Sequence, residues 1–198
     1  MTGEAPRSPA PARERTRRLF LALWPDASMR EQLAHSVRKG VRSSGGRRVP
    51  EANYHITLVF IGAVPEGRVA ELGVVVRAVI GTGTGAGPIE VPLQELAYWP
   101  GPRVLCAVPS APLVGLAGGV GGLLEALAAA AFAPDLKLFR PHVTVARKVM
   151  RPSASAPLHP VLWRFDEFAL IESRTLEAGP VYSVVETYPL FCRTLAAK

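Results

Sequence analysis

Apolar runs with strand-like and helix-like spacing follow one another along most of this chain. Dense or alternating apolar runs bounded by glycine, proline and polar residues predict strands, and apolar positions that repeat every three or four residues predict helices. The expected strands are 18–24, 55–61, 89–97, 103–108, 142–148, 163–171 and 181–191, and the expected helices are 27–39, 65–80 and 112–132. This order of elements predicts an α+β fold with two similar halves around a groove.

Local signals place several of the element ends. Asp26 is suited to capping the first helix, and Gly40 is expected to stop it. Pro65 is tolerated in the first turn of the second helix. Polar, glycine-containing segments predict a loop over 43–48 and a flexible linker over 81–88. The first half of the third helix is rich in glycine, which weakens the helical prediction there because each interior glycine costs roughly 1 kcal/mol relative to alanine.

The size and composition of the chain favour one domain, or two small lobes that share a cleft. The chain has 198 residues, of which 48% are hydrophobic, and a chain of this size buries about 70% of its unfolded surface. Residues 1–16 are rich in proline, alanine and arginine and have no apolar period, which predicts a disordered basic tail. We therefore expect residues 17–198 to form the folded domain.

The positive charge is concentrated near the N-terminus. The chain has 23 Lys and Arg against 16 Asp and Glu, a net charge of +7; residues 1–50 hold 11 and 4 of these, which leaves 12 of each in residues 51–198. A basic segment of this kind can attract a polyanion such as RNA. It is equally well explained as a solvated tail.

The cysteines and the apolar content predict a cytoplasmic protein. Cys106 and Cys192 lie in apolar, strand-like runs, which is typical of buried free thiols and not of a disulfide framework. No apolar stretch reaches the length of a membrane span, and no long apolar helix surface requires a partner. We therefore expect a monomer in the cytoplasm that does not contact a membrane.

Two short segments repeat one pattern: residues 55–58 read His-Ile-Thr-Leu and residues 142–145 read His-Val-Thr-Val. In a strand, residues two apart point to the same face of the sheet, so each segment presents an imidazole beside a hydroxyl. A single histidine in an apolar strand is typical of a buried core residue. Two copies 87 positions apart instead indicate two half-sites that face one substrate.

The two histidines are suited to metal-free acid–base catalysis. An imidazole has an ordinary pKa of about 6.5, so one ring can donate a proton while the other accepts one. Thr57 and Thr144 can donate hydrogen bonds to phosphate oxygens, and Arg147 adds a planar, fixed positive charge. Neither histidine has a second ligand at metal-binding spacing, so no metal and no other cofactor is expected. These groups predict phosphoryl transfer or hydrolysis.

Residues near the two motifs are candidates for contacts with the rest of a nucleic-acid substrate. Arg47 and Arg48 precede the first motif and are expected at the edge of the cleft, where they can contact RNA. Tyr54 alternates with the motif histidine and is expected to face away from the site. Phe60 and Trp99 are either stacking or core aromatics, and the sequence does not separate these two interpretations.

The motifs and their surroundings resemble the 2H phosphoesterase superfamily, which is named for its two His-x-Thr/Ser motifs. The chain is most similar to the bacterial RNA 2′,3′-cyclic phosphodiesterases, also described as 2′-5′ RNA ligase-like proteins. The similarity covers about residues 17–192 and includes the context of both motifs. The matching segments are Arg18–Pro25, Arg48–Pro50, Phe60–Gly62, Phe139–Arg147 and Glu172-Ser173.

The resemblance implies a bilobal α+β fold in which two antiparallel sheets form a V-shaped cleft with helices on the outside. It implies hydrolysis of a 2′,3′-cyclic phosphate, on an RNA end or a nucleotide, to a 2′-phosphate. On this pattern His55 is the proton donor and His142 the proton acceptor, while Thr57, Thr144 and Arg147 hold the phosphate. The alternatives are a nucleotide- or RNA-binding module without significant turnover, and a 2′-5′ RNA ligase that runs the reverse reaction.

Overall fold

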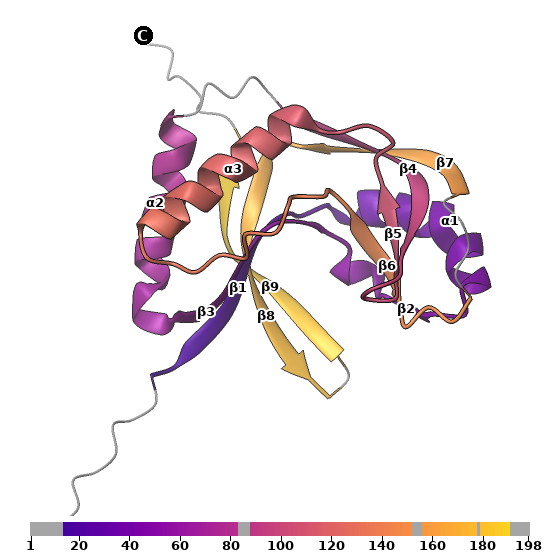
Figure 1. Ribbon diagram of the computed structural model, residues 1–198, viewed down its shortest axis with the longest axis horizontal. Helices are drawn as coiled ribbons and strands as arrows, with labels where there is room; N and C mark the ends of the chain where they lie inside the picture. The colour runs from indigo at the N-terminus through magenta and orange to yellow at the C-terminus, as the bar shows by residue number, and fades with distance from the viewer. Residues whose placement is uncertain (1–13, 83–87, 152–155, 178, 191–198) are drawn as a thin grey trace, which may run out of the picture.

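Two antiparallel sheets with helices packed on their outer sides make up the computed structural model of the protein (Figure 1). The structure describes residues 14–82, 88–151, 156–177 and 179–190. Sheet A has the strand order β3-β1-β8-β9, and sheet B has the order β2-β6-β5-β4-β7. The prediction of an α+β fold built from two antiparallel sheets is therefore confirmed.

The helices lie on the outside of the two sheets. The strands of sheet A are β1 (Thr16–Leu23), β3 (Ile56–Pro65), β8 (Glu167–Leu176) and β9 (Gly179–Pro189). The strands of sheet B are β2 (Arg47–Arg48), β4 (Ile89–Trp99), β5 (Val104–Val108), β6 (Val143–Arg147) and β7 (Ala156–Phe165). The helices are α1 (Ala27–Ser43), α2 (Val69–Thr82) and α3 (Val114–Ala129), with short 3₁₀ turns η1 (Glu51–Asn53) and η2 (Glu66–Arg68). Figure 1 shows α2 and α3 together beside sheet A, whereas α1 packs against β6 and β7 of sheet B.

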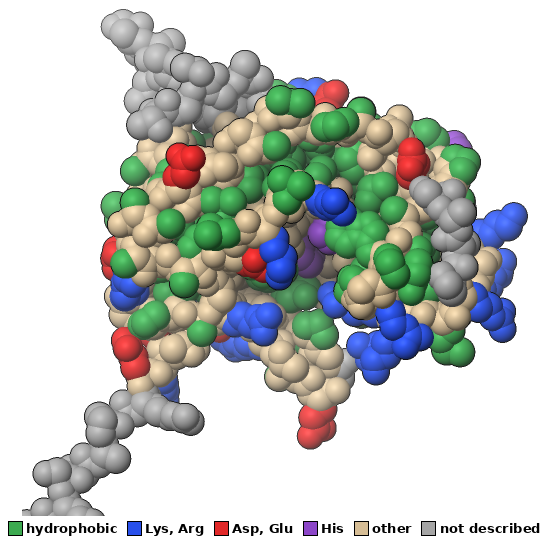
Figure 2. Space-filling model, in the orientation of Figure 1, with side chains coloured by type: hydrophobic (Ala, Val, Ile, Leu, Met, Phe, Trp, Pro, Cys, Tyr) green, Lys and Arg blue, Asp and Glu red, His purple; other side chains and the backbone are tan. Residues whose placement is uncertain are grey.

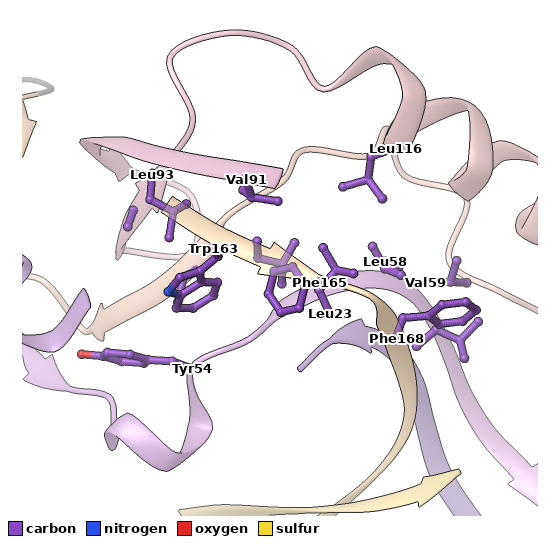
Figure 3. Close-up of a cluster of buried hydrophobic side chains, with 14 of the residues drawn as sticks. Leu23, Tyr54, Leu58, Val59, Val91, Leu93, Leu116, Trp163, Phe165 and Phe168 are labelled. Carbon is purple, nitrogen blue, oxygen red and sulfur yellow. The ribbon is translucent and has the colours of Figure 1, made fainter. Parts of the chain in front are cut away.

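A continuous hydrophobic core joins the two sheets. Trp163 and Phe165 of β7 belong to the same buried cluster as Leu23 of β1 and Tyr54, which precedes β3 (Figure 3). The indole Nε1–H of Trp163 donates a hydrogen bond to the carbonyl oxygen of Met29 in α1 at 2.9 Å. Large aromatic side chains that are buried in this way contribute much of the packing energy of a core, and this core fixes how the two sheets meet.

Helix α1 is longer than the sequence predicts, because it continues through Gly40 to Ser43. The expected stop at Gly40 was wrong: a Cβ atom at this position would lie 2.3 Å from Cδ1 of Leu96, so the glycine permits close packing of the helix on sheet B. The left-handed turn comes instead at Gly45, whose φ is +60°. At the other end, Asp26 caps the helix as expected and accepts a hydrogen bond from a backbone amide at 2.7 Å.

The expected strand 163–171 is in fact parts of two strands. β7 ends and β8 begins on either side of Asp166, where the chain passes from sheet B to sheet A. Trp163 is buried before this point and Phe168 is buried after it. Because apolar side chains continue across the change of sheet, the hydrophobic period alone did not show the break.

Two other boundaries also differ from the expectation. The loop expected over 43–48 ends in a strand, because Arg47 and Arg48 pair with β6. Pro65 is the last residue of β3 and not part of a helix, and α2 starts only after the turn η2. β3 lies at the edge of sheet A, where a proline costs no ladder hydrogen bond.

The third helix is helical throughout its glycine-rich half. It packs against α2, and Gly122 faces Val79 of that helix, where a Cβ atom would make an ordinary van der Waals contact at 3.8 Å. Residues 1–13 of the expected tail, residues 83–87 of the expected linker and Cys192 lie outside the described residues. The tail and the single domain over 17–198 therefore stay predictions, although β1 already begins at Thr16.

Candidate functional site

The two His-Thr motifs belong to different sheets and line one cleft. His55 immediately precedes β3 of sheet A, and Thr57 lies within that strand. His142 immediately precedes β6 of sheet B, and Thr144 lies within it. All four residues line a single cleft of about 220 Å³, which is visible as a hollow with histidine atoms inside it in Figure 2. The fold thus brings together two segments that the sequence keeps far apart.

The backbone holds the two imidazoles in the same way. Nδ1 of His55 lies 2.7 Å from the carbonyl oxygen of Asn53, and Nδ1 of His142 lies 2.7 Å from that of Arg140. A carbonyl oxygen only accepts hydrogen bonds, so Nδ1 is the donor in both rings. In each neutral ring Nε2 is then unprotonated and is the atom left to exchange a proton with a substrate.

Aromatic side chains surround His55, and most of them were not found from the sequence. Its ring centroid lies 5.1 Å from that of Phe20, 5.2 Å from that of Tyr182 and 5.7 Å from that of Trp24. The guanidinium of Arg30 lies 4.7 Å above the ring of Trp24. These residues come from β1, the segment after it, α1 and β9 and have no motif in common, so only the tertiary structure could identify them.

The three aromatic residues near the motifs in sequence take different positions. Tyr54 is fully buried in the core and faces away from the cleft, as predicted. Phe60 is 46% exposed and lines the cleft. The ring of Trp99 lies 4.4 Å from that of His142. Phe60 and Trp99 are therefore residues of the site and not of the core.

Burial lowers the pKa of both histidines. For His55, loss of hydration is the largest cause, and the hydrogen bond to the Asn53 carbonyl opposes it. The positive charges of protonated His142, Arg147 and Arg30 lower the pKa further, and it falls to about 4. The pKa of His142 is lowered as well, first by burial and then by the charge of Arg147. Both rings are therefore neutral at pH 7 in the unliganded protein, and a bound anion would raise both pKa values.

The cationic side chains expected at the site lie on the sheet B side. Arg47, Arg48 and Arg147 all line the cleft. Arg147 lies directly opposite Arg47 in the pairing of β6 with β2, whereas Arg48 forms an ion pair with Glu51. The cleft thus combines two imidazoles, two hydroxyls and a positive rim, which suits a phosphate group.

Cys106 lies beneath Thr144. It is fully buried, as predicted, and its Sγ atom is 4.0 Å from Oγ1 of the threonine. Burial raises the pKa of the Cys106 thiol to about 12, so this side chain stays protonated. It supports Thr144 by packing and does not supply a thiolate nucleophile.

Within residues 14–82, 88–151, 156–177 and 179–190, no group of three or more His, Cys, Asp and Glu side chains is placed to hold a metal ion. Metal-free chemistry therefore stays a prediction. In the same part of the chain, no helix combines the length and the apolar character needed to cross a membrane.

Comparisons with known proteins agree with this geometry. The family model described as LigT like phosphoesterase matches residues 24–106. An RNA 2′,3′-cyclic phosphodiesterase of Thermus thermophilus is 31% identical over 186 residues, which cover 87% of this chain and 90% of the relative. The crystal structure of TT0787 of T. thermophilus matches with a TM-score of 0.71 and 28% identity, covering 87% of this chain and 97% of the other. The crystal structure of E. coli LigT complexed with 3′-AMP matches with a TM-score of 0.78 and 24% identity, covering 89% of this chain and 99% of the other.

Proposed function

The chain belongs to the family of LigT-like phosphoesterases, and from this membership we propose that it is an RNA 2′,3′-cyclic phosphodiesterase. Its substrate is an RNA end or a nucleotide that carries a 2′,3′-cyclic phosphate, and its product is the 2′-phosphate. The observation that carries the proposal is the pair of His-Thr motifs that line one cleft from two sheets. The relative that matches nearly the whole chain bears the name of this activity.

In the proposed reaction, the two histidines act on opposite sides of the phosphorus. Nε2 of His142 takes a proton from a water molecule whose oxygen attacks the phosphorus. The bond from phosphorus to the 3′ oxygen breaks, and Nε2 of His55 gives its proton to that oxygen. The hydrogen bonds from Nδ1 to the backbone carbonyls fix the ring orientations for both transfers.

The other predicted residues bind the phosphate. Thr57 and Thr144 donate hydrogen bonds to its non-bridging oxygens, and Arg147 offsets the negative charge that accumulates on them as water attacks. Arg47 and Arg48 lie at the rim of the same cleft, where they contact the rest of the RNA. Each role uses a group that the fold places at the cleft.

The lowered pKa values predict an acidic optimum for kcat/KM. The active form of the free enzyme has one protonated and one neutral histidine, and this form is most abundant between the two lowered pKa values, below about 6.5. Activity falls as the pH drops through the lower pKa of the pair, about 4, because both rings are then protonated and no base remains, and it falls above the higher pKa, because no protonated ring is left to act as the acid. The bound phosphate anion raises both pKa values, so kcat should peak at a higher pH than kcat/KM. Steady-state profiles on a dinucleotide that ends in a 2′,3′-cyclic phosphate measure both, and a kcat/KM maximum at pH 7 or above contradicts the prediction.

The experiment that tests the proposed function follows the position of the product phosphate. The protein is incubated, in the presence of EDTA, with an oligoribonucleotide that ends in a 2′,3′-cyclic phosphate. We expect conversion to the 2′-phosphate, which chromatography distinguishes from the 3′-phosphate. Conversion only after a divalent cation is restored would contradict metal-free catalysis.

Other outcomes of this experiment separate the alternatives. Binding of the oligoribonucleotide without conversion indicates a binding module, and joining of a 5′-hydroxyl RNA to the cyclic end indicates a ligase. The proposal also includes a monomeric, cytoplasmic enzyme, which sedimentation and cell fractionation test.

A further inference from the structure

Four cationic side chains form a row across one end of sheet B, which we call the basic edge: Arg47, Arg147, Lys148 and Arg103. Arg47 of β2 is opposite Arg147 of β6, and Arg147 is in turn opposite Val104 of β5. Lys148 follows Arg147 in the chain, and Arg103 precedes Val104. All four are exposed. Lys and Arg side chains gather next to the hollow that holds the histidines in Figure 2.

The charges of the basic edge are not neutralised by the protein. None of its four members forms an ion pair with any of the described residues. Like charges directly opposite each other in a sheet are destabilising, as in the pair Arg47 and Arg147. On sheet A the situation differs, because Arg17 and Arg174 share the buried carboxylate of Glu172 at 2.7 and 3.2 Å. An external anion is therefore the available partner of the basic edge.

The backbone at the outer end of the basic edge is held in an unusual conformation. Arg103 and Lys148 have φ values of 55° and 53°, in the left-handed region that glycine and asparagine adopt more easily. The amide of Val149 donates to the carbonyl of Arg103 at 3.0 Å, and Nη2 of Arg103 donates to the carbonyl of Val149 at 3.1 Å. These two hydrogen bonds hold the backbone and the guanidinium of Arg103 against Val149, the residue that follows Lys148. The left-handed conformation thus occurs at two positions that both carry a positive charge.

The basic edge begins inside the cleft and leads out of it. Arg47 and Arg147 line the cleft, whereas Arg103 and Lys148 are not among its lining residues. Strands in a sheet are about 4.8 Å apart, so the row from β2 to β5 spans roughly 10 Å. Stacked nucleotides advance about 3.4 Å each along one strand, so a row of this length can face more than one phosphodiester.

Resting on the proposed function, we infer that the RNA strand on the 5′ side of the cyclic phosphate lies along the basic edge, so that the enzyme prefers oligonucleotide ends to cyclic mononucleotides. The terminal phosphate occupies the His-Thr cleft, and Arg103 and Lys148 bind the phosphodiesters that precede it. Contacts of this kind carry no base specificity. The preference is therefore for chain length and not for sequence.

The test compares two substrates in the double variant Arg103→Gln/Lys148→Gln. One substrate is a 2′,3′-cyclic mononucleotide, and the other is a hexaribonucleotide with the same cyclic end. We expect kcat/KM for the hexamer at low salt to fall about 10-fold, and the slope of its logarithm against log salt to become shallower by about 1.4, or 0.7 per lost phosphate contact on a single strand. For the mononucleotide, kcat/KM should change less than twofold.

A control for the loss of positive charge elsewhere is available on the same sheet. Arg164 is exposed on β7, the strand at the opposite edge of sheet B, and Arg164→Gln removes one positive charge without touching the basic edge. It should leave the activity on both substrates unchanged. The inference is overturned if the double variant loses activity equally on both substrates, or if it keeps full activity on both.

The inference can also be tested separately from the proposed function. If wild-type protein turns over neither substrate, the proposed function fails, and binding of a fluorescent hexaribonucleotide with a 3′-phosphate still reports on the basic edge. Anisotropy should then show at least 10-fold weaker binding by the double variant, and equal affinity would overturn the inference. Melting curves check that both variants are folded.

Discussion

Replacing either motif histidine should abolish turnover while leaving the protein folded. We expect His55→Asn and His142→Asn each to lower kcat by about 10³-fold, within the range of 10² to 10⁴ that general acid–base groups contribute. Asparagine keeps an N–H donor near the position of Nδ1, so the hydrogen bonds to Asn53 and Arg140 can persist, whereas the proton-exchanging Nε2 atom is lost. Single-turnover rates on a cyclic-phosphate oligonucleotide measure the effect.

The double variant makes this prediction sharper. In the proposed mechanism both histidines act in one step, so the combined loss should be much smaller than the product of the two single losses. His35→Asn is a matched control, since His35 is an exposed histidine on α1 that does not line the cleft. The mechanism would be wrong if either single variant, with an unchanged melting temperature, kept more than a tenth of the wild-type rate.

The sequence predicts the contacts within each His-Thr motif, because they depend only on local strand geometry. A His and a Thr two residues apart share a face whenever the segment is a strand, so His55 with Thr57 and His142 with Thr144 could be paired from spacing alone. The meeting of the two pairs depends on two sheets that are built from distant segments. It was predicted because the motif occurs twice and because the chain resembles a known superfamily.

The aromatic surroundings of His55 could not be predicted in the same way. Phe20 and Trp24 lie on and just after β1, and Tyr182 comes from the last strand of sheet A, and in sequence each looks like an ordinary strand aromatic. Phe20 lies on β1, the neighbour of β3, whereas β9 is at the opposite edge of the sheet, and Tyr182 contacts both Phe20 and His55 across the face of the sheet. Consequently the pKa of about 4 for His55 is a property of the fold that the isolated motif does not contain.

The errors in the predicted elements also have a common physical cause. The local rule makes Gly40 a helix stop, whereas the helix continues there and packs so closely on Leu96 that a Cβ atom would displace Cδ1 of the leucine. The hydrophobic period predicts one strand around Asp166, although the apolar side chains before and after this residue belong to two different sheets. In both cases a local rule was overridden by a neighbour that is remote in sequence, which the hydrophobic period cannot report.

Replacing Arg147 should reduce activity strongly and yet spare stability. We expect Arg147→Met to lower kcat/KM by about 10²- to 10³-fold, the usual effect of removing one group that stabilises charge in the transition state. The melting temperature should stay the same or rise, because the change removes the repulsion between Arg147 and Arg47 on neighbouring strands. Arg164→Met, on the far edge of the same sheet, removes an equal charge and should leave activity unchanged.

The same variant should also move the pH profile, and this separates an electrostatic role from a purely structural one. The positive charge of Arg147 lowers the pKa of both His55 and His142, so its removal raises both values and shifts the kcat/KM maximum to higher pH. Arg147→Lys keeps the charge and should keep the position of the maximum, although it loses the planar fork and part of the rate. If Arg147→Met lost activity without any shift of the pH maximum, the arginine would position the substrate only. If Arg147→Met kept both its activity and the pH of its kcat/KM maximum, Arg147 would not belong to the phosphate site.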